Sequence, residues 1–163
     1  MARILIVGGG CRGRSLAAKS LAAGDAARVT TRGEQGRAAI EAIGAECYIG
    51  DPDRLATMRA SLDRATVLCW LMGSATGTEE QLAALHSTRL EFFLTQAIDT
   101  TVRGVVYEQA GAPAELLADG ARRARAILER NAIPAAYLRT PPGDGAAWLA
   151  EATASVDALL GRS

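Results

Sequence analysis

Short apolar runs alternate along the chain with longer segments in which apolar side chains recur at helical spacing. Runs this short, rich in Ile, Leu and Val, are typical of strands that are buried on both faces of a sheet. Alternation of strands and helices predicts an α/β fold, a doubly wound Rossmann domain with a parallel sheet, helices on both faces and right-handed crossovers. We expect six strands, at 4–7, 28–32, 46–49, 66–72, 104–107 and 134–139, in the order 3-2-1-4-5-6.

Helices are expected between these strands, and two of their starting points carry specific signals. Asp51 and Pro52 suit the N-cap and first turn of a helix, and Thr78 with Gln81 matches a capping box before a long helix. The expected apolar stripes are Leu55, Met58 and Leu62 in the first of these helices and Leu82, Leu85, Phe92 and Phe93 in the second. The other predicted helices span 14–23 and 34–43, run from Pro113 to 130, and follow Gly143.

Length and composition narrow the classes of protein. A chain of 163 residues suits one domain over 1–163, and its formal net charge of zero gives no sign of nucleic acid or an acidic membrane as a partner. Cys11, Cys47 and Cys69 lie far apart and His86 is the sole histidine, so we expect no metal site, no disulfide and a cytoplasmic setting. We expect no signal peptide and no membrane span, because no apolar run approaches the required length.

The first strand ends in a cluster of glycines. Gly8, Gly10 and Gly13 match G-x-G-x-x-G between a predicted strand and a predicted helix, which is the setting that a dinucleotide-binding loop requires. The first glycine permits the tight turn, the second lets the backbone approach a pyrophosphate, and the third lets the helix pack closely on the sheet. Free N–H groups at the helix start would bind that pyrophosphate.

The end of the second strand distinguishes the two pyridine dinucleotides. NAD-binding proteins commonly place an acidic residue about 20 residues after the loop, whereas an arginine there accommodates the 2′-phosphate of NADP. This chain has Arg32 at that point, which predicts NADP in preference to NAD. The alternative is that Arg32 is a solvated loop residue. Arg12 and Arg14, in or beside the glycine loop, are candidates to add positive charge near the phosphates.

Several further residues are candidates for the same cofactor site. Asp51 follows the third strand and could bond the adenine amino group, with the helix cap as its alternative role. The loop after the fourth strand, with Leu71, Met72 and Gly73, is expected beside the nicotinamide and its ribose. Cys11 lies at the helix start, where a redox role is an alternative to a plain small residue in a turn.

The glycine loop, Thr30-Thr31-Arg32, Gly50-Asp51, the strand 67–71 and Tyr137-Leu138-Arg139-Thr140-Pro141 resemble the atypical short-chain dehydrogenases/reductases, in particular their epimerase-like, NAD(P)-binding members. The resemblance covers nearly the whole chain and implies a Rossmann fold that binds NAD(P). It also exposes departures. That superfamily uses Tyr-x-x-x-Lys for proton transfer, and Lys19 is the sole lysine here, with no tyrosine four residues before it. The C-terminal substrate domain of extended members is not expected within these residues.

Two functions from different classes remain open. One is a module that binds or senses NADP and acts through a partner, and the other is a small NADPH-dependent reductase that transfers hydride directly to a small molecule. Ser74 and Glu108 are the candidate catalytic residues, with a polar loop residue and an exposed loop glutamate as the alternatives. Tyr107 is expected in the core and His86 at the surface or in packing. Trp148 and Leu149 suit either the core or a contact in a homodimer.

Overall fold

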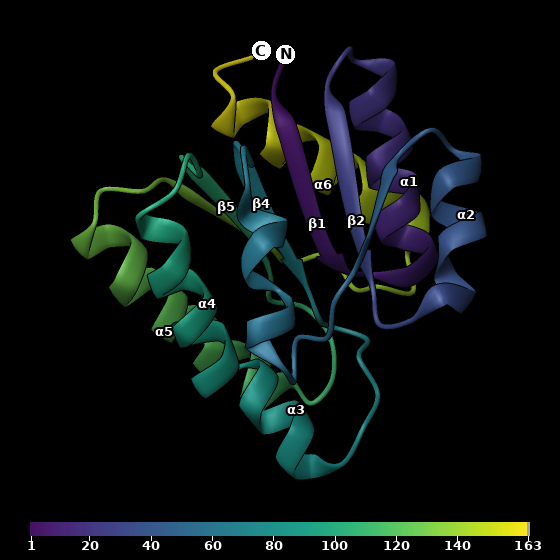
Figure 1. Cartoon of the computed structure of the whole chain (residues 1–163). Helices are drawn as coiled ribbons and strands as arrows, with labels where there is room; N and C mark the ends of the chain where they lie inside the picture. Colours follow the sequence, from purple (N-terminus) through teal and green to yellow (C-terminus); the bar gives the residue numbers. More distant parts are fainter. Residues whose placement is uncertain (163) are drawn as a thin grey trace.

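The computed structural model describes residues 1–162 and contains one six-stranded parallel sheet. The strand order is β3-β2-β1-β4-β5-β6, as predicted, so the order reverses between β1 and β4. All strands point towards the lower edge of the sheet in Figure 1, while both chain termini lie at the upper edge. A doubly wound sheet binds its ligands at the carboxyl ends of the strands, beside the reversal point. The fold therefore places any such site at the lower edge.

Strands β4 and β5 are the most deeply buried, and β1 and β2 follow. In β4 and β5 every residue is buried, and in β1 the four interior residues are, because helices cover both faces of the sheet. Ile4 of β1 pairs with Val67 of β4, and Val67 pairs with Gly104 of β5. The strands are β1 (Arg3–Gly8), β2 (Ala26–Thr31), β3 (Glu46–Ile49), β4 (Val67–Leu71), β5 (Gly104–Glu108) and β6 (Ala135–Leu138).

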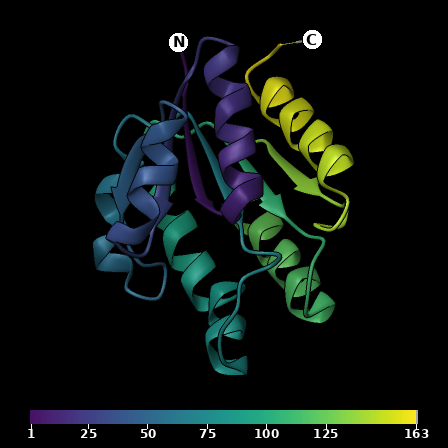
Figure 2. The ribbon, with the colours of Figure 1, turned by 90° about the vertical axis from the view of Figure 1, so that its right-hand side faces the viewer.

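The helices form a layer on each face of the sheet. Helices α1 (Gly10–Ala22), α2 (Arg37–Ala42) and α6 (Gly145–Leu159) cover one face, and Figure 2 shows α6 lying beside α1. Helices α3 (Glu79–Leu85), α4 (Thr88–Ile98) and α5 (Ala114–Arg130) cover the other. Within residues 1–162 none of these helices combines the length and the apolar character needed to cross a bilayer.

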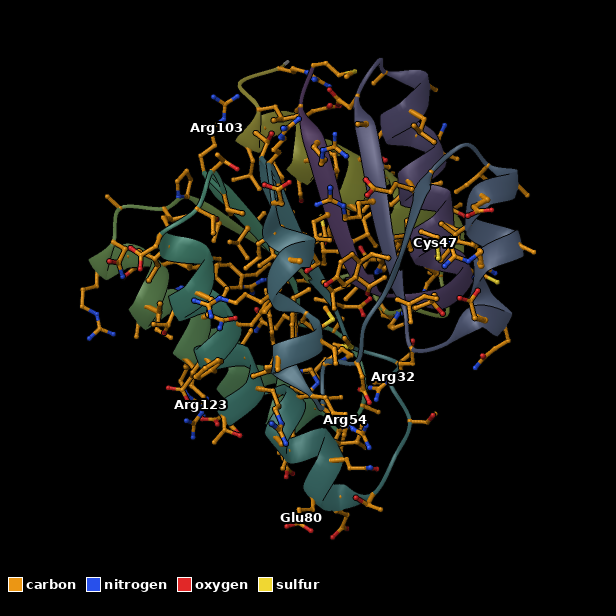
Figure 3. All side chains as sticks on the ribbon, viewed as in Figure 1. Arg32, Cys47, Arg54, Glu80, Arg103 and Arg123 are labelled. Atoms are coloured by element: carbon orange, nitrogen blue, oxygen red, sulfur yellow. The ribbon has the colours of Figure 1, made fainter. Side chains whose placement is uncertain are left out.

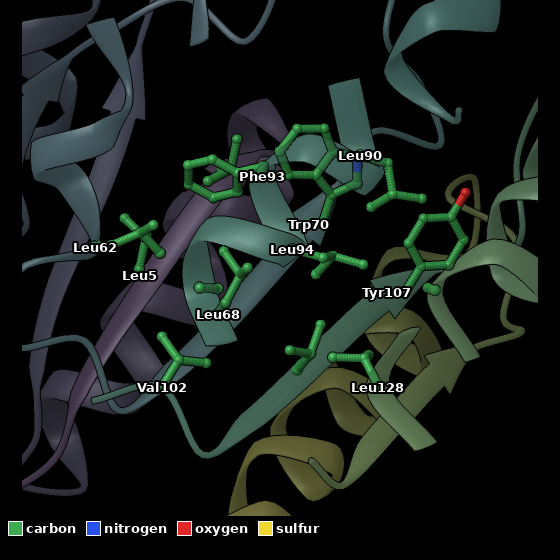
Figure 4. Close-up of a cluster of buried hydrophobic side chains, with 14 of the residues drawn as sticks. Leu5, Leu62, Leu68, Trp70, Leu90, Phe93, Leu94, Val102, Tyr107 and Leu128 are labelled. Carbon is green, nitrogen blue, oxygen red and sulfur yellow. The ribbon is translucent and has the colours of Figure 1, made fainter. Parts of the chain in front are cut away.

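Each layer encloses its own apolar core. Beneath α4 and α5, Trp70 and Tyr107 from the sheet pack with Phe93 of α4, and the rings of Trp70 and Phe93 are 5.5 Å apart (Figure 4). Beneath α1 and α6, Trp148 is the largest buried side chain. Burial of aromatic rings this large contributes a substantial share of the folding free energy. Of the two alternatives for Trp148, the core and a homodimer contact, the structure shows the core.

Several predicted boundaries were wrong at the ends of elements. Helix α1 begins at Gly10, not at residue 14, so Gly13 lies in its first turns, and β2 covers Ala26–Thr31 instead of 28–32. The segment 34–43 divides into a 3₁₀ turn, Glu34–Gly36, followed by α2. The helix begins inside the glycine loop, where Gly13 allows its close approach to β1, as predicted for the third glycine.

The helix predicted to open at Asp51 and Pro52 is absent from the described chain, which has two 3₁₀ turns, Leu55–Thr57 and Arg59–Leu62, in its place. Asp51 caps no helix. Its side chain instead accepts a hydrogen bond from the backbone N–H of Asp53 at 2.9 Å, the pattern of an Asx turn. The expected apolar side chains Leu55, Met58 and Leu62 are nevertheless buried.

The long helix predicted from residue 78 is divided into α3 and α4 at His86 and Ser87. Its start was predicted correctly, because Thr78 and Gln81 form the reciprocal bonds of a capping box. The break is stabilised by the buried indole of Trp70, whose Nε1 donates to the carbonyl of Leu85 at 3.2 Å. That carbonyl lies at the end of α3, where a helix leaves its acceptors unpaired. Phe92, expected on the apolar face, is instead 55% exposed.

Candidate functional site

The glycine loop joins β1 to α1 and has space for a ligand at one glycine only. A Cβ atom added to Gly8, which has a φ of 83°, would stand 2.5 Å from the carbonyl oxygen of Leu71. A Cβ added to Gly13 would stand 2.6 Å from the carbonyl oxygen of Gly8, so helix α1 packs directly on β1. A Cβ on Gly10 would meet no atom within 4 Å. Two glycines thus serve the packing of the loop, and Gly10 faces open space.

The start of α1 presents unpaired donors to that space. Gly9 precedes the helix and provides no capping side chain, and the first turn carries no acidic residue. The N–H groups of Arg12 and Gly13 bond to the carbonyl of Gly9, whereas those of Gly10 and Cys11 have no acceptor in the described chain. A helix start with free N–H groups and a partial positive charge attracts anions. The residues present therefore fit the pyrophosphate of a dinucleotide.

A cleft of about 430 Å³ runs along the carboxyl ends of β2, β1 and β4. The glycine loop forms its middle, residues after β2 and β3 form one end, and the loop after β4 forms the other. No carboxylate is among its lining residues. These are Gly8, Gly9, Gly10, Cys11, Arg12, Thr30, Thr31, Arg32, Gly50, Pro52, Leu71, Met72, Ser74, Ala75 and Thr76.

At the β2 end, Arg32 has a half-exposed side chain and two acidic neighbours. Its Nη1 donates to Asp51 Oδ1 at 2.7 Å and to Asp53 Oδ2 at 2.8 Å, and Figure 3 shows Arg32 beyond the end of the sheet. The structure thus brings together the predicted residues Arg32 and Asp51. It adds Asp53, which was not among the predicted site residues. Nε and Nη2 of Arg32 have no partner within residues 1–162.

At the β4 end, Arg12 lines the cleft and is held by neighbouring side chains. Its guanidinium turns towards the interior, where Nη1 donates to Glu108 and Nη2 donates to Ser74 Oγ at 2.6 Å. The guanidinium carbon also stands 4.7 Å from the centroid of the Trp148 ring, within the range of a cation–π contact. Only 14% of the Arg12 side chain is exposed. Arg14, the other arginine of the loop, donates to Cys11 Sγ at 3.2 Å.

Glu108 corrects one prediction, because it is fully buried and not the exposed loop residue expected as the alternative to a catalyst. Its carboxylate accepts from the Gly73 N–H at 2.6 Å, from Trp148 Nε1 at 2.7 Å and from Arg12. A buried carboxylate must be paired and hydrogen-bonded to be tolerated. Glu108 therefore joins the glycine loop, the loop after β4 and helix α6. Trp148 was missed as a part of the site, and no local pattern marks it.

Behind Glu108, the preceding residue Tyr107 bonds to His86. The Tyr107 hydroxyl lies 2.6 Å from His86 Nδ1, and both side chains are buried. Burial lowers the pKa of His86 to about 4 and raises the pKa of Tyr107 well above its usual value. Both groups are neutral near pH 7, which suits packing and not proton transfer. Tyr107 thus lies in the core, as predicted.

The remaining candidates divide between the cleft and its support. Leu71, Met72, Ser74 and Cys11 line the cleft, as a cofactor site at this edge requires. Gly73 lies behind it, and a Cβ there would stand 2.6 Å from Glu108 Oε1. The structure therefore places Gly73 and Glu108 in the support of the cleft and Ser74 in its wall.

No family model and no curated protein sequence matches the chain. Solved structures do match it, among them a putative NAD-dependent epimerase/dehydratase from Bacillus halodurans (TM-score 0.70, 16% identity, 86% of this chain and 71% of that one). Triphenylmethane reductase from Citrobacter sp., complexed with NADP(H), matches with a TM-score of 0.63 and 18% identity over 85% of this chain and 49% of that one. Vestitone reductase from alfalfa (Medicago sativa L.) matches with a TM-score of 0.65 and 11% identity over 84% of this chain and 56% of that one.

These matches confirm the predicted structural resemblance to an epimerase/dehydratase and to reductases with a Rossmann fold. At such low identities they show the fold alone. The chain spans about half the length of two of these proteins, triphenylmethane reductase and vestitone reductase, at 49% and 56%.

Proposed function

We propose that the chain binds a pyridine dinucleotide in this cleft, with NADP(H) preferred over NAD(H), and acts as a cofactor-binding or sensing module. The observation that carries the proposal is the glycine loop. Gly8 and Gly13 are closed by contacts with Leu71 and with each other, while Gly10 faces open space beside unpaired N–H groups. That combination suits the close approach of a pyrophosphate to the backbone.

Different residues of the chain would bind different parts of the dinucleotide. The N–H groups at the start of α1 would hold the pyrophosphate, and Arg32 would bind the 2′-phosphate through Nε and Nη2, which its two acidic neighbours leave free. Asp51 lies near enough to Arg32 to serve the adenosine half. Leu71, Met72 and Ser74 line the half that the nicotinamide would occupy. A bound nicotinamide supplies hydride chemistry.

A role without the usual proton transfer is supported by two observations. The chain has no Tyr-x-x-x-Lys, and Lys19 is its sole lysine. Glu108, a candidate acid or base, has both oxygens engaged by Gly73, Trp148 and Arg12. A buried, fully bonded carboxylate is a poor proton donor or acceptor for a ligand.

The second candidate function is a small NADPH-dependent reductase. It is favoured by Ser74 and Arg12, which provide hydrogen-bond donors in the wall of the nicotinamide half. Oxidation of NADPH in the presence of quinones, aldehydes or flavins would support this candidate. Turnover that persists in Ser74→Ala would leave the reductase without its proposed site.

We place the protein in the cytoplasm in this proposal, because its three free cysteines lie too far apart in the chain to form a disulfide framework. A sensing module also requires a protein partner or a second copy of the chain. Thermal unfolding with and without NADPH, followed by size-exclusion chromatography of both samples, tests whether the cofactor changes the assembly state.

Calorimetric titration of the chain with NADPH and with NADH tests the proposal directly. We expect tighter binding of NADPH and a higher melting temperature in its presence, because a ligand of the folded state stabilises it. Arg32→Asp should bring the two dissociation constants together or reverse their order, while Arg54→Asp, on an adjacent turn, serves as the matched control. Failure of both dinucleotides to bind would refute the proposal, and an unchanged preference in Arg32→Asp would remove the role of Arg32.

A further inference from the structure

The end of the cleft opposite Arg32 has its own chemistry, which the dinucleotide does not account for. Pyrophosphate binds at the start of α1 and the adenosine half lies over β2, so the wall beside β4 belongs to the nicotinamide half. In this wall Arg12 is a cation with 14% of its side chain exposed, and Ser74 accepts one of its hydrogen bonds. A cation placed there faces whatever lies next to the nicotinamide.

The ion pair between Arg12 and Glu108 presents its positive member to the cleft. Glu108 is fully buried, whereas Arg12 lines the cleft, so the carboxylate lies behind the guanidinium as seen from the ligand. The cleft therefore meets the positive end of the pair. Because no carboxylate is among the residues that line the cleft, nothing in its wall opposes an anion beside Arg12.

Donors of both Arg12 and Ser74 remain for a ligand. Glu108 engages Nη1 of Arg12, and Ser74 accepts from Nη2, which leaves Nε–H without an acceptor in the described part of the chain. The hydroxyl of Ser74 accepts from Arg12, so its own hydrogen is free to be donated. A guanidinium N–H and a neighbouring hydroxyl match the two oxygens of one carboxylate.

We propose that Arg12 and Ser74 bind the carboxylate group of a small organic acid beside the nicotinamide half of the cleft. The inference rests on the proposed function, because it takes the rest of the cleft to hold the dinucleotide. A monoanion suits this end better than a phosphate dianion, since Glu108 already compensates the charge of Arg12 and each further negative charge would be only partly balanced. Glu108 and Trp148 act as positioning residues that fix the guanidinium.

Trp148 provides a direct readout of this binding. Its indole N–H bonds to Glu108 at 2.7 Å and its ring lies under Arg12, so its resonance reports on the guanidinium. Trp70 lies in the other core and is an internal reference. The protein, with saturating NADPH, is titrated with sodium lactate and with lactamide, a neutral molecule of nearly the same shape. NADPH cannot reduce lactate, so no turnover interferes.

We expect lactate to shift the Trp148 indole resonance in a saturable way, with no matching shift at Trp70 and none with lactamide. Ser74→Ala should weaken lactate binding by about tenfold, the usual effect of losing one hydrogen bond to a charged group. Arg12→Met combined with Glu108→Gln should abolish it without leaving a buried charge unpaired. Arg54→Gln, on the turn beside Arg32 and outside the lining of the cleft, should leave it unchanged.

Each alternative gives a distinct result. If NADPH binds but lactate causes no shift, the carboxylate site is refuted and the proposed function stands. If NADPH itself does not bind by calorimetry, the proposed function is refuted. If the double variant weakens NADPH binding by tenfold or more while lactate has no effect on the native protein, Arg12 serves the cofactor and the inference is wrong. Equal shifts by lactate and inorganic phosphate would refute the preference for carboxylate.

Discussion

The two ends of the cleft each use an arginine paired with carboxylates, in opposite surroundings. At the β2 end the side chain of Arg32 is 46% exposed and its partners, Asp51 and Asp53, lie on a turn outside the sheet. At the β4 end Arg12 is 14% exposed and its partner Glu108 is fully buried at the end of β5. The same pair of chemical groups therefore has different consequences for stability at the two ends.

The difference follows from water. Exposed ion pairs contribute about 0–1 kcal/mol, because solvent screens them and both side chains lose freedom. A buried pair holds its groups in place, and removal of one partner leaves a charge that neither water nor protein compensates. Arg32 can therefore exchange its partners for a ligand, whereas Arg12 stays with Glu108. We interpret the β2 end as adaptable and the β4 end as fixed.

The largest expected effect comes from breaking the fixed end. Glu108→Ala should lower the free energy of unfolding by about 3–5 kcal/mol, because Arg12 loses its counterion and Gly73 and Trp148 lose an acceptor. Urea denaturation followed by circular dichroism measures this. Adding Arg12→Met to Glu108→Ala should restore part of the loss. A decrease below about 1 kcal/mol in Glu108→Ala would show that the two ends do not differ as proposed.

A slightly smaller effect is expected from His86, behind the fixed end, which should make the free energy of unfolding depend on pH. Its pKa is lowered to about 4 in the folded protein, so between that value and the usual 6.5 the unfolded chain binds more protons. Stability should be complete above pH 6.5 and fall by on the order of 3 kcal/mol as the pH approaches 4. The carboxyl groups with lowered pKa values, such as Asp25 and Asp119, titrate below this window. Denaturation midpoints across pH 4–8 for the native protein and His86→Gln test this, and the variant should lose the slope.

Between the two ends, the glycine loop allows a matched comparison. Gly13→Ala should destabilise the fold by about 1–3 kcal/mol, because its Cβ would meet the carbonyl oxygen of Gly8 at 2.6 Å. Gly10→Ala should cost only about 1 kcal/mol, from its φ of 52°, and should weaken dinucleotide binding more than it weakens the fold. Thermal unfolding and calorimetry on both variants separate these effects. Equal loss of binding and stability in Gly10→Ala would contradict a ligand-facing role for this glycine.

The smallest effect is expected at the adaptable end. Asp53→Asn should change the free energy of unfolding by less than about 1 kcal/mol, because its pair with Arg32 is partly exposed. It should also tighten NADPH binding relative to NADH, since Arg32 loses a competitor for the 2′-phosphate. Denaturation and paired calorimetric titrations provide the measurement. A large destabilisation would mean that this end is fixed as well.

Local patterns were sufficient for the sheet and for the glycine loop. The bounds of β3 and the capping box at Thr78 were predicted correctly, because each depends on residues that are close in the sequence. The strand order was predicted correctly from the alternation of strands and helices, which is typical of a doubly wound fold. The predicted helix at Asp51 failed for a tertiary reason. Asp51 pairs with Arg32, which lies 19 residues earlier, and its side chain closes a turn onto Asp53.

The fixed end of the cleft could not be predicted in the same way. Glu108 follows an apolar strand and resembles any polar residue at the start of a loop. Its burial depends on Arg12, 96 residues away, and on Trp148, 40 residues away. The break at His86 likewise depends on the indole of Trp70. Propensity and periodicity have no information on such partners, which only the folded chain brings together.

The long separations around Glu108 have a consequence for kinetics. Contacts between residues far apart in the chain close large loops, and loop closure must be accomplished before these contacts stabilise anything. Interactions that form after the transition state mainly determine the rate of unfolding. The bonds of Glu108 to Arg12 and Trp148 should therefore lower the rate of unfolding. The lifetime of the native protein, more than the speed at which it folds, would then be set at the β4 end of the cleft.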